Sequence, residues 1–131
     1  AVVVLGTSVV VVAQEWPVLK QGMWEITRTM QAPGGGAPKV VNTKRCMDPA
    51  EDWKQQNARM SRMGCAFSPI KKSGGTYTFT AACNVMGTSS KTTTTIVPEG
   101  DSAYTLTVTG TTDGAATNET MKAKWTGACT K

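Results

Sequence analysis

The sequence predicts a mainly β domain: an antiparallel meander forming a curved sheet or partly open barrel, with one short helix and two disulfides. Three observations favour this class. Apolar and threonine residues alternate through the second half of the chain, which is the two-residue period of strands with one buried face. Glycine-containing turn sequences separate the alternating runs. Four cysteines without a C-x-x-C pair favour disulfides over a zinc site or a redox pair.

The chain has 131 residues, which is enough for one domain with a single core. We divide it into a Val-rich segment, residues 1–13, and a single β-rich domain, residues 14–131. The formal net charge is +5, but the basic residues are scattered and form no dense run. Nucleic-acid-binding proteins usually carry a basic stripe with interleaved aromatic residues or a known motif. We therefore expect no nucleic-acid partner.

The N-terminal segment, residues 1–13, is uncharged and rich in valine. Val11 and Ala13 stand at positions −3 and −1 of a signal-peptidase site before Gln14, which predicts the remnant of a signal peptide and therefore export. Its β-branched residues also favour an extended strand, so an added strand and a membrane anchor remain as alternatives. The candidate assembly-strand residues are Val3, Val4, Val9, Val10, Val11 and Val12.

The folded part opens with a strand and a hairpin. The strand places four side chains on one face: Trp24, Ile26, Arg28 and Met30. The glycine- and proline-rich stretch at residues 32–38 predicts a hairpin loop. The chain then returns over residues 39–46 as an antiparallel strand.

A helix is predicted over about residues 49–62. Asp48 suits the N-cap, Pro49 the first helical position, and Glu51 completes a capping-box-like start. Three residues fall on the side that we expect to face the sheet: Trp53, Asn57 and Met60.

The turn at residues 73–75, Ser-Gly-Gly, predicts which cysteines pair. A three-residue loop places Lys72 opposite Thr76. The same register places Cys65 opposite Cys83, on the face that also carries the aromatic residues of this hairpin. The sequence therefore predicts a disulfide between these two cysteines.

The other two cysteines, Cys46 and Cys129, are then left to pair with each other. This bridge would tie the end of the second strand to the C-terminus of the chain. Pro69 cannot donate a hydrogen bond to a neighbouring strand, so we expect the strand around it to be bulged or to lie at an edge.

The rest of the chain is predicted as a three-stranded meander, with turns at residues 98–102 and 113–114. The expected opposed pairs are Ile96 with Tyr104, Thr94 with Leu106, Leu106 with Met121, and Tyr104 with Ala123. The three strands share one apolar side, formed by Ile96, Tyr104, Leu106, Val108, Met121, Ala123 and Trp125. Their other side is a threonine surface of Thr93, Thr95, Thr105, Thr107 and Thr109.

The chain contains no histidine, which excludes Ser-His-Asp and Cys-His catalysis and an imidazole metal site. Its carboxylates mostly stand at helix starts and turns. Glu25 and Glu119 would act as an acid and a base only if the fold brought them together, and no sequence pattern places them so. We expect a non-enzymatic protein without catalytic residues, metal or cofactor.

Four features together resemble the DUF3617 family of small bacterial envelope proteins. They are the opening Leu19-Lys20-x-Gly22-x-Trp24-Glu25, Cys46 followed by an Asp-Pro helix start, the Cys65 hairpin, and a Met121 strand that ends in Gly127-x-Cys129. The likeness covers residues 19–129, and Gln21 stands where proline is frequent in the family. The resemblance implies a β-rich fold exported to the periplasm or exterior of a Gram-negative cell. It implies no activity, because the function of the family is unassigned.

Two functions of different class remain. The first is a structural or interaction domain, a subunit of an envelope assembly or extracellular fibre in which residues 1–13 add a strand to a neighbouring chain. The second is the binding of a small lipid-like molecule on the apolar sheet face, with these lining residues: Trp24, Tyr104, Leu106, Met121 and Trp125. A more remote alternative is Cu(I) binding by methionine sulfur, at Met60 and Met63 with Met47 and Trp53 nearby.

Overall fold

The structure is a computed structural model that describes residues 16–31 and 36–129. The Val-rich segment, and every prediction that concerns it, lies outside the described residues. Eight strands and one helix follow within them: β1 (Gly22–Met30), β2 (Lys39–Met47), α1 (Pro49–Met63), β3 (Cys65–Phe67), β4 (Lys71–Ser73), β5 (Thr76–Val85), β6 (Thr88–Glu99), β7 (Ala103–Thr112) and β8 (Ala115–Gly127).

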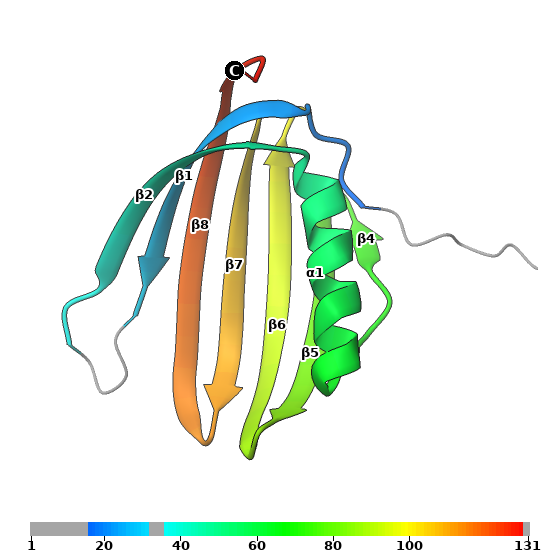
Figure 1. Cartoon of the computed structure of the whole chain (residues 1–131), viewed down its shortest axis with the longest axis vertical. Helices are drawn as coiled ribbons and strands as arrows, with labels where there is room; N and C mark the ends of the chain where they lie inside the picture. The colour runs from blue at the N-terminus through cyan, green and yellow to red at the C-terminus, as the bar shows by residue number, and fades with distance from the viewer. Residues whose placement is uncertain (1–15, 32–35, 130–131) are drawn as a thin grey trace, which may run out of the picture.

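The strands form one antiparallel sheet in the order β2-β1-β8-β7-β6-β5-β3, with β4 also paired to β5. Figure 1 shows the sheet curving, with α1 lying across its front. The sheet does not close into a barrel, because β2 stands at one end of the order and β3 at the other. The predicted class is confirmed, with the curved open sheet as the correct form.

The two-residue period separates a core face from an outer face. The buried core residues come mainly from alternate positions of the long strands: Trp24, Ile26, Tyr77, Phe79, Ile96, Tyr104, Leu106 and Ala123. The helix packs on this face, where Trp53 meets Tyr104 edge-on with ring centroids 5.0 Å apart. The predicted threonine surface lies on the outer face, since its residues alternate with core positions of β6 and β7.

The helix begins and ends at residues suited to those positions. The carboxylate of Asp48 accepts a hydrogen bond from the backbone N–H of Glu51, as the N-cap prediction requires. Gly64 ends the helix in the left-handed conformation, with φ at 119°. A Cβ atom at this position would lie 2.4 Å from the carbonyl oxygen of Asn84, so the sequence needs glycine here. The helix is one residue longer than predicted.

Both predicted disulfides are present. Cys65 pairs with Cys83, and Cys46 pairs with Cys129. The second bridge joins β2 to the residues just after β8. These are the two strands that flank β1, because Met23 lies opposite both Cys46 and Gly127.

The loop between β4 and β5 is one residue shorter than the sequence predicted. Ser73 lies opposite Thr76, so the turn contains two residues rather than three. The pairing of Cys65 with Cys83 nevertheless holds, because the register shifts by one residue between β4 and β3. Pro69 lies in this interruption, which confirms the bulge expected around it.

The register predicted between β6 and β7 is wrong by two residues. Ile96 lies opposite Leu106 rather than Tyr104, and Thr94 opposite Val108, because the turn is centred one residue later than expected. An even shift keeps every side chain on its predicted face. The other two expected pairs, Leu106 with Met121 and Tyr104 with Ala123, are confirmed.

The longer disulfide should stabilise the fold more than the shorter one. The bridges close 83 and 18 residues of chain, and the loop-entropy model assigns about 4.5 and about 3 kcal/mol to such closures. We expect urea unfolding to show a larger loss of free energy for Cys46→Ala/Cys129→Ala than for Cys65→Ala/Cys83→Ala. The opposite order would show that strain or residual structure dominates.

Gly110 should tolerate no side chain. Its φ is 153°, and an added Cβ would lie 2.0 Å from the carbonyl oxygen of Lys91 on β6. Gly110→Ala should therefore lower the free energy of unfolding by about 3 kcal/mol or more, since backbone strain adds to the clash. Gly127→Ala is the matched control, because Gly127 has φ at 149° with open space around it. Equal losses in urea unfolding would contradict the steric argument.

The buried hydroxyl of Tyr104 should make stability depend on alkaline pH. Burial raises the pKa of this phenol above its ordinary value, and nearby Asp52 raises it further. The folded state therefore keeps the proton that the unfolded chain releases, so the contribution is complete below about pH 10 and is lost as pH rises beyond it. Urea titrations between pH 8 and 11 measure how the free energy of unfolding falls as pH rises. This fall should be shallower for Tyr104→Phe than for the unaltered protein. An equally steep fall in both proteins would contradict this role of Tyr104.

Candidate functional site at the β2 end of the sheet

The outer edge of β2 is open along its whole length. Residues 39–47 pair one by one with β1 without a register shift, and among the described residues no strand pairs with the other side of β2. Most of its side chains are exposed, with Met47 the buried exception. An unpaired edge of this length exposes a row of backbone N–H and C=O groups that another strand can pair with.

The opposite end of the described sheet is different. There, β5 is covered by β3 and β4, which have three residues each. The interruption at Ser68–Ile70 separates them, and Pro69 has no backbone N–H to offer. The long unbroken edge is therefore at the β2 end in the part of the chain that the structure describes.

Two charged side chains of β2 form ion pairs with neighbouring elements. The Lys44 ammonium lies 3.9 Å from the Glu25 carboxylate on β1, and Arg45 lies 3.5 Å from Asp52 on α1. All four side chains are substantially exposed, so each pair contributes little to stability.

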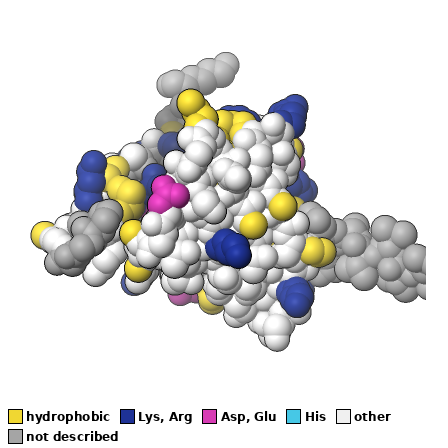
Figure 2. All heavy atoms as spheres, turned by 90° about the horizontal axis from the view of Figure 1, so that it is seen from below, with side chains coloured by type: hydrophobic (Ala, Val, Ile, Leu, Met, Phe, Trp, Pro, Cys, Tyr) yellow, Lys and Arg dark blue, Asp and Glu magenta, His cyan; other side chains and the backbone are white. Residues whose placement is uncertain are grey.

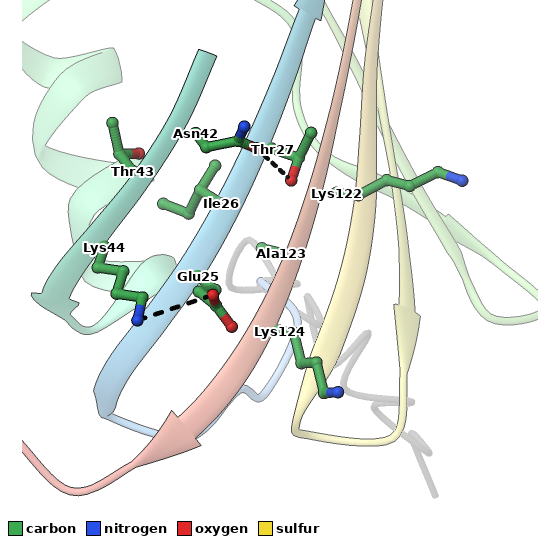
Figure 3. Close-up of a pocket in the computed structure, with 9 residues that line it drawn as sticks. All are labelled: Glu25, Ile26, Thr27, Asn42, Thr43, Lys44, Lys122, Ala123 and Lys124. Carbon is green, nitrogen blue, oxygen red and sulfur yellow. Dashed lines mark hydrogen bonds and ion pairs between the residues drawn. The ribbon is translucent and has the colours of Figure 1, made fainter. Parts of the chain in front are cut away.

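A cavity of about 430 Å³ lies beside this edge, across β2, β1 and β8. Figure 3 shows Lys44, Glu25 and Lys124 around it, with a hydrogen bond of 3.0 Å from the hydroxyl of Thr27 to the side-chain oxygen of Asn42. In the register of the sheet, Glu25 lies between Lys44 and Lys124. The Glu25 carboxylate pairs with the Lys44 ammonium at 3.9 Å.

A second cavity of about 520 Å³ lies on the other side of β8, towards β7. It shares Lys122 and Lys124 with the first cavity. Within the described residues, neither lysine belongs to an ion pair. Elsewhere the basic side chains are dispersed, and the view from below shows single Lys and Arg side chains on a mostly uncharged surface (Figure 2).

The residues expected to line a site for an apolar ligand lie mostly inside the core. Trp24, Tyr104 and Leu106 are buried, and the Tyr104 hydroxyl donates to the sulfur of Met121 at 3.8 Å. Trp125 is partly exposed and lines the second cavity.

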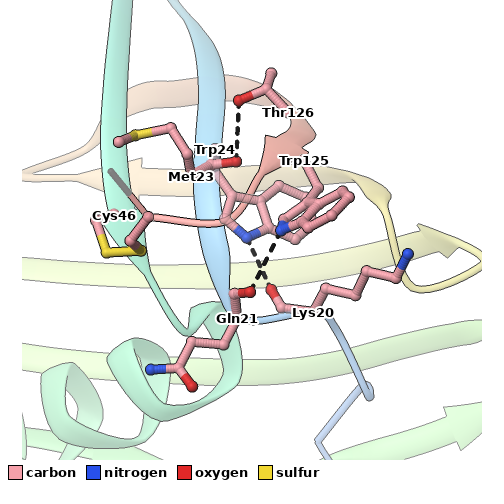
Figure 4. The surroundings of a disulfide bond; sticks show 8 residues. Lys20, Gln21, Met23, Trp24, Cys46, Trp125 and Thr126 are labelled. Carbon is pink, nitrogen blue, oxygen red and sulfur yellow. Dashed lines mark hydrogen bonds between the residues drawn. A yellow bond between two sulfur atoms is a disulfide. The ribbon is translucent and has the colours of Figure 1, made fainter. Parts of the chain in front are cut away.

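Hydrogen bonds hold the two indoles at this end of the sheet. Figure 4 shows them beside the disulfide of Cys46, donating to backbone oxygens. Trp24 donates to Lys20 at 2.9 Å and Trp125 donates to Gln21 at 3.3 Å. The ammonium of Lys20 also lies 4.5 Å from the centre of the Trp125 ring.

The structure does not gather the remaining candidate residues. Met60 and Met63 lie one turn apart near the end of α1. Met47 precedes the helix, so most of the helix separates it from the other two methionines considered for Cu(I). Glu25 lies on the outer face and Glu119 on the core face, where Glu119 accepts a hydrogen bond from Arg28. That hydrogen bond raises the pKa of Arg28.

The described residues contain no group of three or more His, Cys, Asp or Glu side chains arranged to hold a metal ion. No described helix is long and apolar enough to span a membrane.

Sequence reasoning did not identify the lysine pair. The available signal was the alternation Lys-Ala-Lys at residues 122–124, which places both ammonium groups on one face of a strand. Their neighbours are supplied by β1 and β7, and β1 lies about a hundred residues away in sequence. This long-range pairing could not be recognised from local pattern.

Comparison with known proteins gives one match. The DUF3617 family, described as a protein of unknown function, matches residues 19–129. No curated protein and no solved structure matches the chain. The match covers most of the chain and includes both disulfides, so this protein belongs to the DUF3617 family.

Proposed function

We propose that this protein is a non-enzymatic subunit of an extracytoplasmic assembly, in which the open edge of β2 accepts a strand from a neighbouring copy. The unbroken nine-residue edge carries the proposal. The donor is the Val-rich segment, residues 1–13, whose β-branched sequence suits a strand. Val3 to Val12 spans ten positions, which is sufficient to pair along all of β2.

The disulfides support an extracytoplasmic location for the assembly. Two disulfides indicate an oxidising, extracytoplasmic compartment. We place the assembly in the periplasm or on the exterior of a Gram-negative cell, after export by a signal sequence. Retention of residues 1–13 in the assembled protein is part of this proposal.

The first described residue and the open edge of β2 stand at opposite ends of the sheet. Trp16, where the described chain begins, packs against Phe79 of β5 with ring centroids 5.7 Å apart and lines a cavity with residues of β3. Four strands separate β5 from β2. Residues 13–15 span about 10 Å at most when extended, which favours a neighbour's β2 over the chain's own.

This arrangement predicts the form of the assembly. A donor at one end and an acceptor at the other make a head-to-tail contact between different surfaces. Such contacts repeat without closing unless the rotation between copies generates a ring. A fibre is therefore the form that we propose, with strand addition providing its main-chain hydrogen bonds.

Deleting residues 1–13 should remove the donor and leave the fold intact. We expect the full chain to form oligomers or fibres in light scattering and negative-stain electron microscopy. The truncated chain should be monomeric and should melt as a folded domain. The truncated chain, whose β2 edge has no donor strand, should then bind a synthetic peptide of residues 1–13. Monomeric full-length protein together with no peptide binding would overturn the proposal.

Two neighbouring proline variants provide a matched test of the acceptor. Successive N–H groups of a strand point to opposite edges, so one of Thr43→Pro and Lys44→Pro removes a hydrogen bond to β1 and the other removes an outward donor. The variant that retains near-normal thermal stability should fail to assemble and to bind the peptide. Normal assembly by that variant would exclude the β2 edge as the acceptor.

A further inference from the structure

A pair of lysines stands between two cavities on the outer face of β8. The first cavity extends towards β1 and β2, and the second extends towards β7. Lys122 and Lys124 line both cavities. They are two positions apart on one strand, so their side chains leave the same face about 7 Å apart at the backbone.

The positive charge of this pair is incompletely compensated. Glu25, the carboxylate in the first cavity, is already paired with Lys44 at 3.9 Å. Glu99 lines the far side of the second cavity. Lys122 lies between Thr27 and Thr105 in the sheet register, so hydroxyl groups rather than carboxylates are its direct neighbours.

We propose that this face binds an acidic oligosaccharide that lies across the strands and occupies both cavities. Its anionic groups would contact Lys122 and Lys124, which donate charge-assisted hydrogen bonds. Its neutral hydroxyls would donate to the carboxylates of Glu25 and Glu99 and to the hydroxyl oxygen of Thr27, whose own proton is donated to Asn42. The chemical class is a sugar chain with carboxylate, sulfate or phosphate groups.

The carboxylates favour a sugar chain over an anionic membrane. A lipid surface presents dense negative charge, which the carboxylates of Glu25 and Glu99 would repel. A sugar chain has hydroxyl donors to satisfy them. The two cavities, of about 430 and 520 Å³, also extend on both sides of the lysines, which favours an elongated ligand over a single small anion.

This inference does not depend on strand addition, because its residues include the outer face of β8 and not the backbone edge of β2. The experiment uses fluorescence anisotropy with the full chain and a labelled oligogalacturonate or sulfated dextran oligomer. Neutral dextran and phosphatidylglycerol vesicles are the comparison probes. We expect the acidic oligomers to bind, with affinity that falls as salt rises, and the neutral oligomer not to bind.

The double variant Lys122→Gln/Lys124→Gln should weaken oligomer binding by about tenfold or more. The matched control is Lys71→Gln/Lys91→Gln, which removes the same net charge at exposed positions outside both cavities. An equal loss of oligomer affinity in both double variants would show general electrostatic attraction and overturn the assignment of the site. Binding to vesicles that is stronger than binding to the oligomers would also overturn it, in favour of a membrane surface.

Two further variants test whether the ligand spans both cavities. Asn42→Asp adds a negative charge in the first cavity, and Ser102→Asp adds one in the second, at positions that are not direct neighbours of Lys122. An elongated acidic oligomer should lose affinity with either change. An effect of only one of them would overturn the spanning arrangement. Melting curves of all variants establish that the fold is retained.

Discussion

The pairing of β1 with β8 is the contact on which the rest of the molecule depends. It joins the first strand to the last and brings the β1–β2 hairpin onto a meander that the remaining strands form by local turns. Trp24 is fully buried at this junction and packs against Tyr104 of β7. The bridge from Cys46 to Cys129 then holds β2 and the end of β8 on either side of β1. Without the pairing of β1 with β8, neither the position of the β2 edge nor the lysine-lined cavity would exist.

The aromatic core fixes where the chain enters the domain. Trp16 stacks on Trp53 of α1 and contacts Phe79, while the adjacent Pro17 is fully buried. These contacts anchor the start of the described chain at the β5 end of the sheet. The open edge is at the other end because the sheet does not close. The head-to-tail arrangement of the proposed assembly thus follows from core packing rather than from any feature of β2 itself.

Features that depend on nearby residues were predictable from the sequence, whereas contacts between strands far apart in the chain were not. The N-cap at Asp48 and the faces predicted for β1, β5, β6, β7 and β8 depend on nearby residues and a two-residue period, and these predictions were correct. The turn centre near Gly100 was misplaced by one residue, which shifted the β6–β7 register by two and left the faces unchanged. The predicted pairing of Cys65 with Cys83 held because the interruption at Pro69 offset a one-residue error in the turn at residues 74–75. The lysine site needed the β1–β8 register, for which the sequence contains no local signal.

The two proposed sites are physically coupled because β2 contributes to both. Asn42 and Lys44 belong to the open edge strand and line the first cavity. A strand added to β2 would therefore form a new wall next to that cavity. The Val-rich donor is uncharged, so it would lower the local dielectric without neutralising Lys124 or Lys122, and attraction for an acidic sugar chain would increase. Linkage requires the converse by the same factor: bound sugar would favour strand addition. Because charged residues lie beside the open edge, strand addition at β2 and binding of an acidic sugar chain would favour each other.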